Sequence, residues 1–325
     1  MPPQNFRPLL DVIDTYTSFC ILGHMDPDMD CLGSQRALAS WLKRRGKTVV
    51  LCSFGPWRRE DVSSWKEFFL SSIPDFPPGE EVLTVLLDCS SPERTGFKES
   101  DFPKGATAVI DHHATSGVFG DFRFIDANCP STTMLIQHLM EAAGDVPTQE
   151  EAQLLFFGFC TDTGFFRHLD SGKAQYLKAA ARLMELGVSP TDTHCMLFGG
   201  RSLGSRRLIG RALERAELHY EGRVLLTWEN WKDWRECGSE RDSDMLYQLL
   251  ISIAGVEAVA VIREQNDGLC IVNMRSVTDL DVSAIAEFFG GGGHRKAAGC
   301  TISGDRHDAS EHLLRIFADR LNTHS

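Results

Sequence analysis

Histidine and aspartate side chains, which bind divalent cations, recur in four short segments of the first half of the chain. The segments are GHMDPDMD (23–30), VLTVLLD (82–88), DHH (111–113) and CTDTG (160–164). They supply six candidate metal ligands: His24, Asp28, Asp30, Asp88, His112 and Asp162. This mixture of imidazole and carboxylate groups suits Mn²⁺ better than Ca²⁺ or a thiolate-bound zinc. Because six ligands exceed what one four-coordinate ion uses, the sequence predicts two ions bridged by a shared carboxylate.

The elements that must position these residues alternate between strands and helices. Short apolar runs bounded by polar or Gly/Pro residues predict buried parallel strands at 18–24, 48–54, 82–90 and 106–111. Helical spacing of apolar residues predicts helices at 31–45, 131–144, 148–160 and 172–187. Such alternation indicates an α/β domain, in which ligands collect outside the carboxyl ends of the strands. We assign all four segments, that of Asp162 included, to this strand edge.

Each residue taken alone also has a simpler interpretation. An aspartate at a strand end is commonly a helix cap or a turn residue, and an isolated histidine is commonly an ordinary surface or core group. Asp26 is interpreted as an exposed loop carboxylate, and Arg94 in SPERTG as a surface charge. Ser131 and Thr132 are expected to cap the helix that follows them. The four segments with candidate ligands are assigned to the same edge of the predicted sheet. This coincidence favours metal binding as the interpretation of the six residues together.

A second, smaller α/β or α+β domain is expected after a connection rich in Pro, Gly, Ser and Thr. We place a catalytic domain at 1–190, a flexible linker at 191–204 and a substrate-binding domain at 205–325. In the latter, a strand pair is expected around QNDG (265–268). Helices are expected at 206–218, 284–289 and 309–321.

Composition and charge exclude several classes of protein. The sequence has no signal-peptide pattern and no long uninterrupted apolar run, so neither export nor a membrane location is expected. Ten scattered cysteines without a C-x-x-C pair are typical of a reducing cytoplasm. The net charge of −12 argues against tight binding of long duplexes, which depends on Lys and Arg. A nucleotide partner should therefore be short.

The motifs, in their order along the chain, resemble those of the DHH phosphoesterase family. The first four are GHMDPDMDCLGS, VLLDCSSPERTG, VIDHHAT and GFCTDTGFF, and GGGGHRKAAG (290–299) resembles the signature of the DHH-associated C-terminal domain. The resemblance covers residues 18 to 305 and is strongest to short standalone members. These are the nano-RNases that also hydrolyse 3′-phosphoadenosine 5′-phosphate (pAp), and their relatives that cleave cyclic dinucleotides or the linear products.

The resemblance implies how the two ions are held. One ion would be bound by His24, Asp28 and Asp88 and the other by Asp30, Asp88, His112 and Asp162, so that Asp88 is the bridge. The ions implied are two Mn²⁺, with Mg²⁺ or Co²⁺ as alternatives. His113 could contact the scissile phosphate or act as an acid toward the leaving oxygen. Asp111 is interpreted as orienting a ligating imidazole, with a direct catalytic role as the alternative.

The glycine run of the second domain is the expected substrate contact. Gly291, Gly292 and Gly293 allow backbone N–H groups to approach phosphate, and the helix-like KAAG after them could add a positive helix end. The resemblance makes His294, Arg275 and Ser276 substrate contacts. We therefore expect hydrolysis of short oligoribonucleotides and dinucleotides, and of pAp.

Other functions remain open at this point. They are a cyclic dinucleotide phosphodiesterase, a polyphosphate or pyrophosphate hydrolase, a single-strand exonuclease and a nucleotide sensor without catalysis. The glycine-rich loop argues against the polyphosphate hydrolases, and the short acidic chain argues against a processive exonuclease. Complete ligand positions argue against a degenerate sensor. A homodimer is compatible with this sequence.

Overall fold

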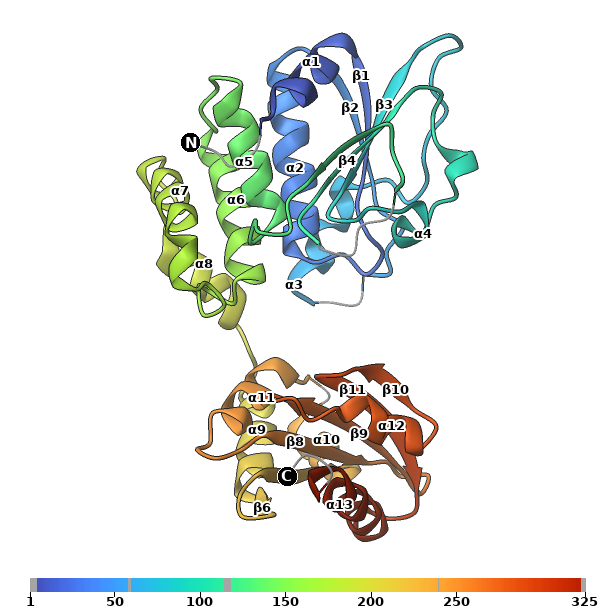
Figure 1. Cartoon of the computed structure of the whole chain (residues 1–325), viewed down its shortest axis with the longest axis vertical. Helices are drawn as coiled ribbons and strands as arrows, with labels where there is room; N and C mark the ends of the chain where they lie inside the picture. The colour runs from blue at the N-terminus through green and yellow to red at the C-terminus, as the bar shows by residue number, and fades with distance from the viewer. Residues whose placement is uncertain (1–4, 58–59, 114–117, 239, 323–325) are drawn as a thin grey trace. The chain divides into compact units, whose positions relative to one another are not determined.

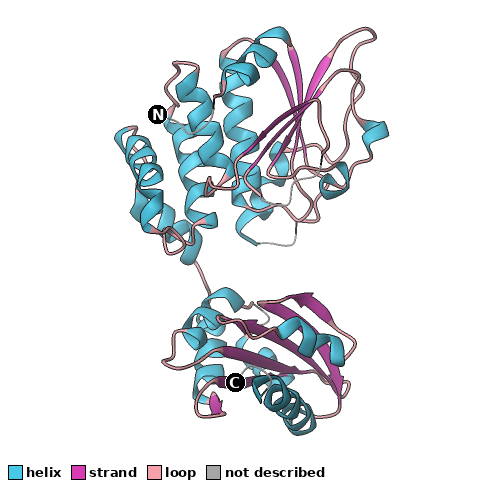
Figure 2. Ribbon diagram, viewed as in Figure 1, coloured by secondary structure: helices cyan, strands magenta, loops and turns pink. Residues whose placement is uncertain are grey.

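The computed structural model of the chain describes residues 5–57, 60–113, 118–238 and 240–322 (Figures 1 and 2). Ala114 and Thr115, which end the VIDHHAT motif, lie outside the described residues. The chain divides into two compact units, residues 1–199 and 200–325. None of the described helices combines the length and the apolar character that crossing a membrane requires.

The first unit contains a parallel sheet of five strands in the order β2-β1-β3-β4-β5. The strands are β1 (Ser18–Leu22), β2 (Thr48–Cys52), β3 (Val82–Leu87), β4 (Thr107–Asp111) and β5 (Phe122–Ile125). Every residue of β1 and β3 is buried, which agrees with their continuous apolar sequence. The α/β class and the parallel sheet are confirmed, while the short strand β5 was not expected.

Helices cover one face of this sheet. They are α1 (Arg7–Thr15), α2 (Met29–Arg44), α5 (Thr132–Ala142), α6 (Gln149–Asp162), α7 (Ala174–Glu185) and α8 (Pro190–Phe198). Of these, α2 and α5 contact the strands directly and share a core with Phe19, Ile21 and Val85, while α6 packs against α2 and α5, and α7 packs against α5 and α6. The other face, with Cys20 and Leu22, is covered by loop residues such as Ile73 and Phe97. Of the short helices α3 (Glu60–Ser63) and α4 (Pro92–Thr95), α3 places Val62 in the core on the helix-covered face. Figure 1 shows α2, α5 and α6 beside one another, which places the start of α2 next to the end of α6.

The strand order changes direction between β1 and β3. The chain moves from β1 to β2 on one side, and β3 then pairs with the other side of β1. At such a point the loops that follow neighbouring strands diverge and leave a crevice at the carboxyl ends. His24 follows β1 and Asp88 directly follows β3, so both lie at this position.

Two expectations for the first unit are corrected. Asp162 does not follow a strand, because it is the last residue of helix α6. The expected linker 191–204 is also largely helical, since α8 occupies Pro190–Phe198 and α9 (Leu203–Glu214) begins soon afterwards. Ser189 caps α8 through the N–H of Asp192, and Pro190 fits the first helical turn, so a Pro/Ser-rich sequence here starts a helix.

The second unit contains a mixed sheet of six strands in the order β10-β11-β9-β8-β7-β6. The strands are β6 (Glu217–His219), β7 (Val224–Asn230), β8 (Ala258–Glu264), β9 (Leu269–Ser276), β10 (Gly292–His294) and β11 (Ala297–Ser303). The expected strand pair around QNDG is β8 and β9. Helices α12 (Val282–Phe288) and α13 (Arg306–Asn322) pack on one face. Helices α9 and α11 (Ser243–Ile251) pack on the other, and α10 (Trp231–Cys237) follows β7.

The segment KAAG (296–299) is not helical, contrary to expectation. Ala297–Gly299 begin strand β11, which pairs with β9 on one side and with the glycine-rich β10 on the other. The two partner strands satisfy the backbone groups of this segment, and this tertiary pairing outweighs the helix propensity of two alanines.

Candidate metal centre

The six predicted metal ligands lie together at the carboxyl end of the first sheet. Nε2 of His24 lies 3.4 Å from Oδ2 of Asp88 and 3.7 Å from Oδ1 of Asp28. Nε2 of His112 lies 3.1 Å from Asp162, 3.4 Å from Asp88 and 3.9 Å from Asp30. Asp88 is the residue common to both groups, with one carboxylate oxygen toward each histidine.

Backbone carbonyl groups orient both imidazole rings toward the carboxylates. Nδ1 of His24 lies 2.8 Å from the carbonyl oxygen of Met25, and Nδ1 of His112 lies 3.3 Å from that of Cys129. A carbonyl oxygen only accepts hydrogen bonds, so Nδ1 carries the proton in each neutral ring. This leaves the lone pair of Nε2 directed at the cluster, as in metal-binding histidines.

The N-terminus of helix α5 holds the two most buried carboxylates among the six candidate ligands, Asp30 and Asp88. Asp30, which is completely buried, accepts hydrogen bonds from the backbone N–H groups of Thr132 (2.6 Å) and Thr133 (2.9 Å) and from the Thr133 hydroxyl (2.6 Å). The Thr132 hydroxyl donates to Asp88 (2.9 Å). Ser131 caps the helix, as expected. The roles of Thr132 and Thr133 were missed, although consecutive Ser and Thr residues at a helix start are the signal that could have indicated them.

Burial and mutual repulsion perturb the carboxyl groups of the cluster. Burial raises the pKa of Asp30 well above its ordinary value, and the neighbouring Asp162 and Asp88 raise it further. Burial likewise raises the pKa of Asp162 to about 6, with Asp88 and Asp28 adding to the effect. Burial acts in the opposite direction on His112, but Asp162, Asp30 and Asp88 raise its pKa to about 10. The carboxylates of this cluster therefore require compensating positive charge.

These residues fit divalent cations. Nε2 of His112 is buried and has no hydrogen-bond partner among the residues that the structure describes, although three carboxylates lie within 3.9 Å of it. A buried polar atom without a hydrogen-bond partner is unfavourable, and a bound metal ion would satisfy it. Asp88 also has a φ of 60°, which is uncommon for a residue other than glycine and directs its carboxylate between the two histidines.

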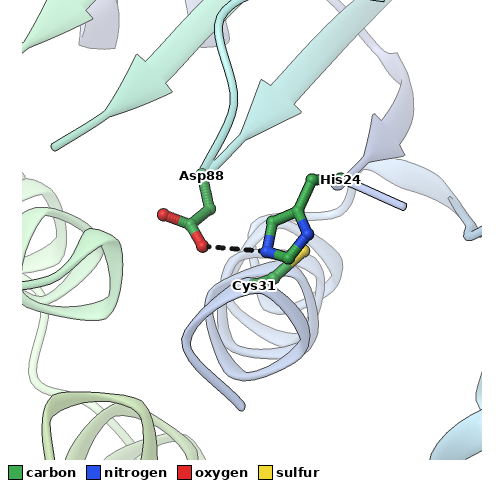
Figure 3. A group of neighbouring side chains, drawn as sticks. All are labelled: His24, Cys31 and Asp88. Atoms are coloured by element: carbon green, nitrogen blue, oxygen red, sulfur yellow. Dashed lines mark ion pairs between the residues drawn. The ribbon is translucent and has the colours of Figure 1, made fainter. Parts of the chain in front are cut away.

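Cys31 is a neighbour of the cluster that the sequence analysis did not single out. Its thiol lies with the ligand atoms of His24 and Asp88 in a group whose members are within 4.8 Å of one another. Figure 3 shows its sulfur beside the imidazole of His24, on the first turn of α2. Its place directly after Asp30 in the sequence was the available signal.

His113 and Asp111 form a pair at the edge of the cluster. Asp111, the last residue of β4, is buried, and its Oδ1 accepts from both the backbone N–H (3.1 Å) and Nδ1 (2.8 Å) of His113. Asp111 thus orients His113 rather than the imidazole of His112, which corrects the expected contact. The bond to Asp111 raises the pKa of His113. The side chain of His113 is 38% exposed, so it remains accessible to a substrate.

Two further residues of the sequence analysis lie on the loops of this edge. Asp26 is exposed, and its backbone N–H donates to the carbonyl oxygen of Gly55 (3.0 Å). Arg94 is exposed as well, and its carbonyl oxygen accepts from the N–H of Met25 (2.6 Å).

The residues expected to contact substrate in the second unit separate into two groups. Arg275 of β9 and His294 of β10 are both paired with Ala297 of β11, so their side chains share one sheet face. Gly291, Gly292 and Gly293 are exposed beside them. Ser276 differs, because it is buried and its hydroxyl donates to the carbonyl oxygen of Thr278 (3.3 Å).

Similarity to known proteins agrees with this arrangement. Residues 18–159 match the DHH family, N-terminal domain, and residues 237–323 match the DHHA1 domain. The bifunctional oligoribonuclease and PAP phosphatase NrnA of Thermus thermophilus is 31% identical, over 93% of this chain and 89% of its own. The chain belongs to the DHH family.

Solved structures share the fold of this DHH-family chain. An exopolyphosphatase-related protein from Bacteroides fragilis aligns with a TM-score of 0.79 and 20% identity, covering 98% of this chain and 95% of its own. The exonuclease RecJ bound to manganese aligns with a TM-score of 0.54 and 16% identity, covering 98% and 96%. At these identities the similarity establishes the common fold.

Proposed function

We propose that this DHH-family protein is a metal-dependent phosphoesterase that hydrolyses short oligoribonucleotides and dinucleotides, and also pAp. The observation that carries the proposal is the cluster around Asp88, in which two oriented imidazoles face four carboxylates. The relative from Thermus thermophilus, which bears the name of an oligoribonuclease and PAP phosphatase, supports the substrate class.

The two imidazoles divide the cluster into two cation sites. We assign His24, Asp28 and Asp88 to one ion, and Asp30, Asp88, His112 and Asp162 to the other. Manganese is the proposed metal, with Mg²⁺ or Co²⁺ as alternatives, because mixed nitrogen and oxygen ligands suit it. The manganese-bound RecJ structure, which shares the fold, is consistent with this choice.

The chain's own residues supply the remaining parts of the reaction. Two bound cations would lower the pKa of a water molecule and offset charge on the phosphate. His113, held by Asp111 and accessible at the edge of the cluster, is placed to donate a proton to the leaving oxygen. The bond to Asp111 raises the pKa of His113, which favours the protonated form that this role needs.

Recognition is assigned to the second unit. Arg275 and His294 share a sheet face, and the exposed Gly291, Gly292 and Gly293 offer backbone N–H groups to a phosphate. We leave Ser276 out of this proposal, because its hydroxyl is bonded within its own loop. Within residues 191–204, the stretch between α8 and α9 is proposed as the connection between catalysis and recognition.

The test is hydrolysis by protein freed of metal with a chelator and reloaded with a single cation. We expect Mn²⁺ to restore cleavage and Ca²⁺ to fail, since Ca²⁺ prefers a shell made of oxygen ligands. The kcat/KM values for short oligoribonucleotides, linear dinucleotides and pAp should exceed those for cyclic dinucleotides and polyphosphate. A higher value for a cyclic dinucleotide would make the cyclic dinucleotide phosphodiesterase the correct function, and equal rescue by Ca²⁺ would contradict the ligand assignment.

A further inference from the structure

Arg275, Ala297 and His294 form one row of directly paired residues across β9, β11 and β10. The neighbouring row on the same face of the sheet consists largely of glycine. Asn273 of β9 pairs with Gly299 of β11, and Gly299 pairs with Gly292 of β10. Directly paired residues direct their side chains to the same face, so this row has an amide at one end and bare backbone beyond it. The space above Gly292 is open and the space above Gly299 is bordered by the Asn273 amide, so the two glycines form a floor beside that amide on which a planar group can lie.

This part of the face is only partly covered, since Gly292 is exposed and Asn273 and Gly299 are half-buried. The core under α9 and α11 includes Leu225 of β7 and Val259 and Val261 of β8, and it includes no buried residue of β9, β10 or β11. Along β9, alternate residues are buried against α12 and α13, whereas Ile271 on the partly covered face is 40% exposed.

The amide of Asn273 is fixed in one orientation. Nη1 of Arg263 donates to Oδ1 of Asn273 (2.7 Å), and the guanidinium of Arg263 is itself held by Glu229 (3.3 Å) and by the Ser243 hydroxyl (3.1 Å). Arg263 and Glu229 are both buried, so this contact is preorganised. Asn273 therefore presents Nδ2, a donor, to the partly covered face.

The position of Nδ2 agrees with this orientation. A Cβ atom at position 299 would lie 2.8 Å from Nδ2, so the NH₂ group stands at the edge of the glycine floor. Nδ2 has no hydrogen-bond partner among the described residues. Its two N–H groups are available to a ligand that lies on the floor.

Positive charge lies one row away. Arg275 and His294 are two residues from Asn273 and Gly292 along their strands, a separation of about 7 Å. The guanidinium of Arg275 stacks on the ring of Tyr247 (4.8 Å), and the Tyr247 hydroxyl donates to the carbonyl oxygen of Asn273 (3.0 Å). A phosphate at Arg275 and a planar base on the floor would leave room for a ribose between them.

We propose that Asn273, Gly299 and Gly292 form a nucleobase subsite in which Asn273 selects bases by their hydrogen-bond acceptors. The inference rests on the proposed function for the class of ligand, a nucleoside 5′-phosphate. Guanine presents two acceptors, O6 and N7, along one edge, whereas adenine presents one acceptor beside a donor. Because Oδ1 is committed to Arg263, the subsite prefers guanine to adenine.

The test is calorimetric binding of GMP, AMP and ribose 5-phosphate to the full chain with a chelator present, so that no turnover occurs. GMP should bind more tightly than AMP, and both should bind more tightly than ribose 5-phosphate, which lacks a base. In Asn273→Ala the affinity for GMP should fall about tenfold while that for ribose 5-phosphate stays unchanged. Thr301→Ala is the matched control, since Thr301 is exposed one row further along the same face and should leave all three affinities unaltered.

Two other variants test the geometry without removing the partner of Arg263. Asn273→Asp keeps an acceptor for Arg263 but replaces the NH₂ donors, so it should weaken GMP more than AMP. Gly299→Ala would place a methyl group on the floor and should weaken both nucleotides more than ribose 5-phosphate.

The decisive quantity is the ratio of the affinity for GMP to the affinity for ribose 5-phosphate. If this ratio is the same in the wild type, Asn273→Ala and Asn273→Asp, the subsite is overturned. The proposed function is read separately, by turnover with Mn²⁺. Selective GMP binding through Asn273 without any hydrolysis would contradict the proposed function and uphold the subsite. Hydrolysis with Mn²⁺ together with nucleotide affinities that do not change when Asn273 is substituted would support the proposed function and contradict the subsite.

Discussion

At the scale of single residues, Asp88 is the centre of the site. Its two carboxylate oxygens face His24 and His112 separately, and the Thr132 hydroxyl fixes one of them. A carboxylate that belongs to both proposed cation sites cannot be replaced by its neighbours, because each of these is directed at one site alone.

We expect Asp88→Ala to lower kcat by about a thousandfold or more, because both proposed cations would lose a ligand. Bound manganese, measured by atomic emission after dialysis, should fall with it, while the circular dichroism spectrum stays that of the wild type. Asp26→Asn is the matched control, since Asp26 is exposed on the same loop edge. Activity within about tenfold of wild type would contradict the shared-ligand assignment.

Thr133→Val tests a residue that orients the proposed metal ligand Asp30 and is not itself a ligand. The substitution keeps the shape of the side chain but removes the hydroxyl that donates to Asp30. Because partners that orient ligands commonly contribute about 10- to 100-fold to metal affinity, manganese binding should weaken by that factor. Thr133→Ser, which keeps the hydroxyl, should bind nearly as wild type. Equal affinities for the Val and Ser variants would show that the hydroxyl does not matter.

At the scale of elements, helix α6 both packs in the core of the first unit and carries a residue of the candidate metal centre. Its C-terminal residue is Asp162, and its interior residue Gly158 allows close approach to α2 and α5. A Cβ atom at position 158 would lie 2.5 Å from Cγ2 of Thr133 and 2.8 Å from Oδ1 of Asp30.

Gly158→Ala should therefore disturb the cluster, even though alanine favours helix. We expect a loss of about 1–3 kcal/mol in the free energy of unfolding, from overpacking, together with weaker manganese binding. Gly210→Ala in helix α9 is the control, because open space surrounds that position and the change should stabilise by about 0.5–1 kcal/mol. Urea denaturation compares the two, and equal stabilisation would refute the steric argument.

The start of α6 depends on an ion pair between a buried carboxylate, Glu151, and an exposed arginine, Arg44. Glu151 accepts from Arg44 (2.8 and 3.0 Å) and from the N–H of Thr148 (2.8 Å). Burial of the carboxyl group opposes ionisation, but these donors outweigh it and hold the pKa of Glu151 below its ordinary value. The carboxylate thus stabilises the fold above the unfolded-state pKa of about 4.3, and this contribution is lost as the pH falls further.

Glu151→Gln should lower the free energy of unfolding by about 1–3 kcal/mol at neutral pH, through loss of charged hydrogen bonds. The difference from wild type should shrink once the pH is below about 4. Glu150→Gln provides the comparison, since Glu150 pairs with Arg36 at the surface and should contribute about 0–1 kcal/mol. Denaturant titrations across this range measure both, and a gap for Glu151→Gln that does not change with pH would rule out the assigned ionisation.

At the scale of the whole molecule, the net charge of −12 leads us to expect that only short nucleic acids are substrates. Proteins that follow long nucleic acids neutralise many phosphates with a continuous basic groove. This chain has 33 basic against 45 acidic residues, so added phosphates are repelled once the few binding groups are filled.

Cleavage rates should accordingly be highest for the shortest oligoribonucleotides and fall as length increases. A series from two to about twenty nucleotides at constant salt measures this, the upper length exceeding the site size of single-strand binders. Added salt should reduce the penalty for the longer substrates, because it screens the repulsion. Rates that rise steadily with length would indicate an extended binding track instead.

Local patterns were sufficient for the class of fold and for the six candidate ligands. Apolar runs such as VLTVLL predict a buried strand by composition alone, and a polar residue directly after such a run is assigned to the sheet edge by the rule for parallel strands. Asp162 was placed by its motif, although the element that carries it was assigned wrongly. Whether an apolar segment becomes a strand or a helix depends on what packs against it, as KAAG also shows.

The sequence by itself determined which residues could bind metal and that they meet at one sheet edge, because that information lies in side-chain type and in periodicity along the chain. Only the tertiary structure decided which neighbouring groups hold the functional side chains in their orientations. The bonds from Thr132 and Thr133 to Asp88 and Asp30, from His113 to Asp111, and from Arg263 to Asn273 join residues through the geometry of the backbone. Most of these partners are far apart in the chain, and local periodicity carries no information on contacts between distant segments.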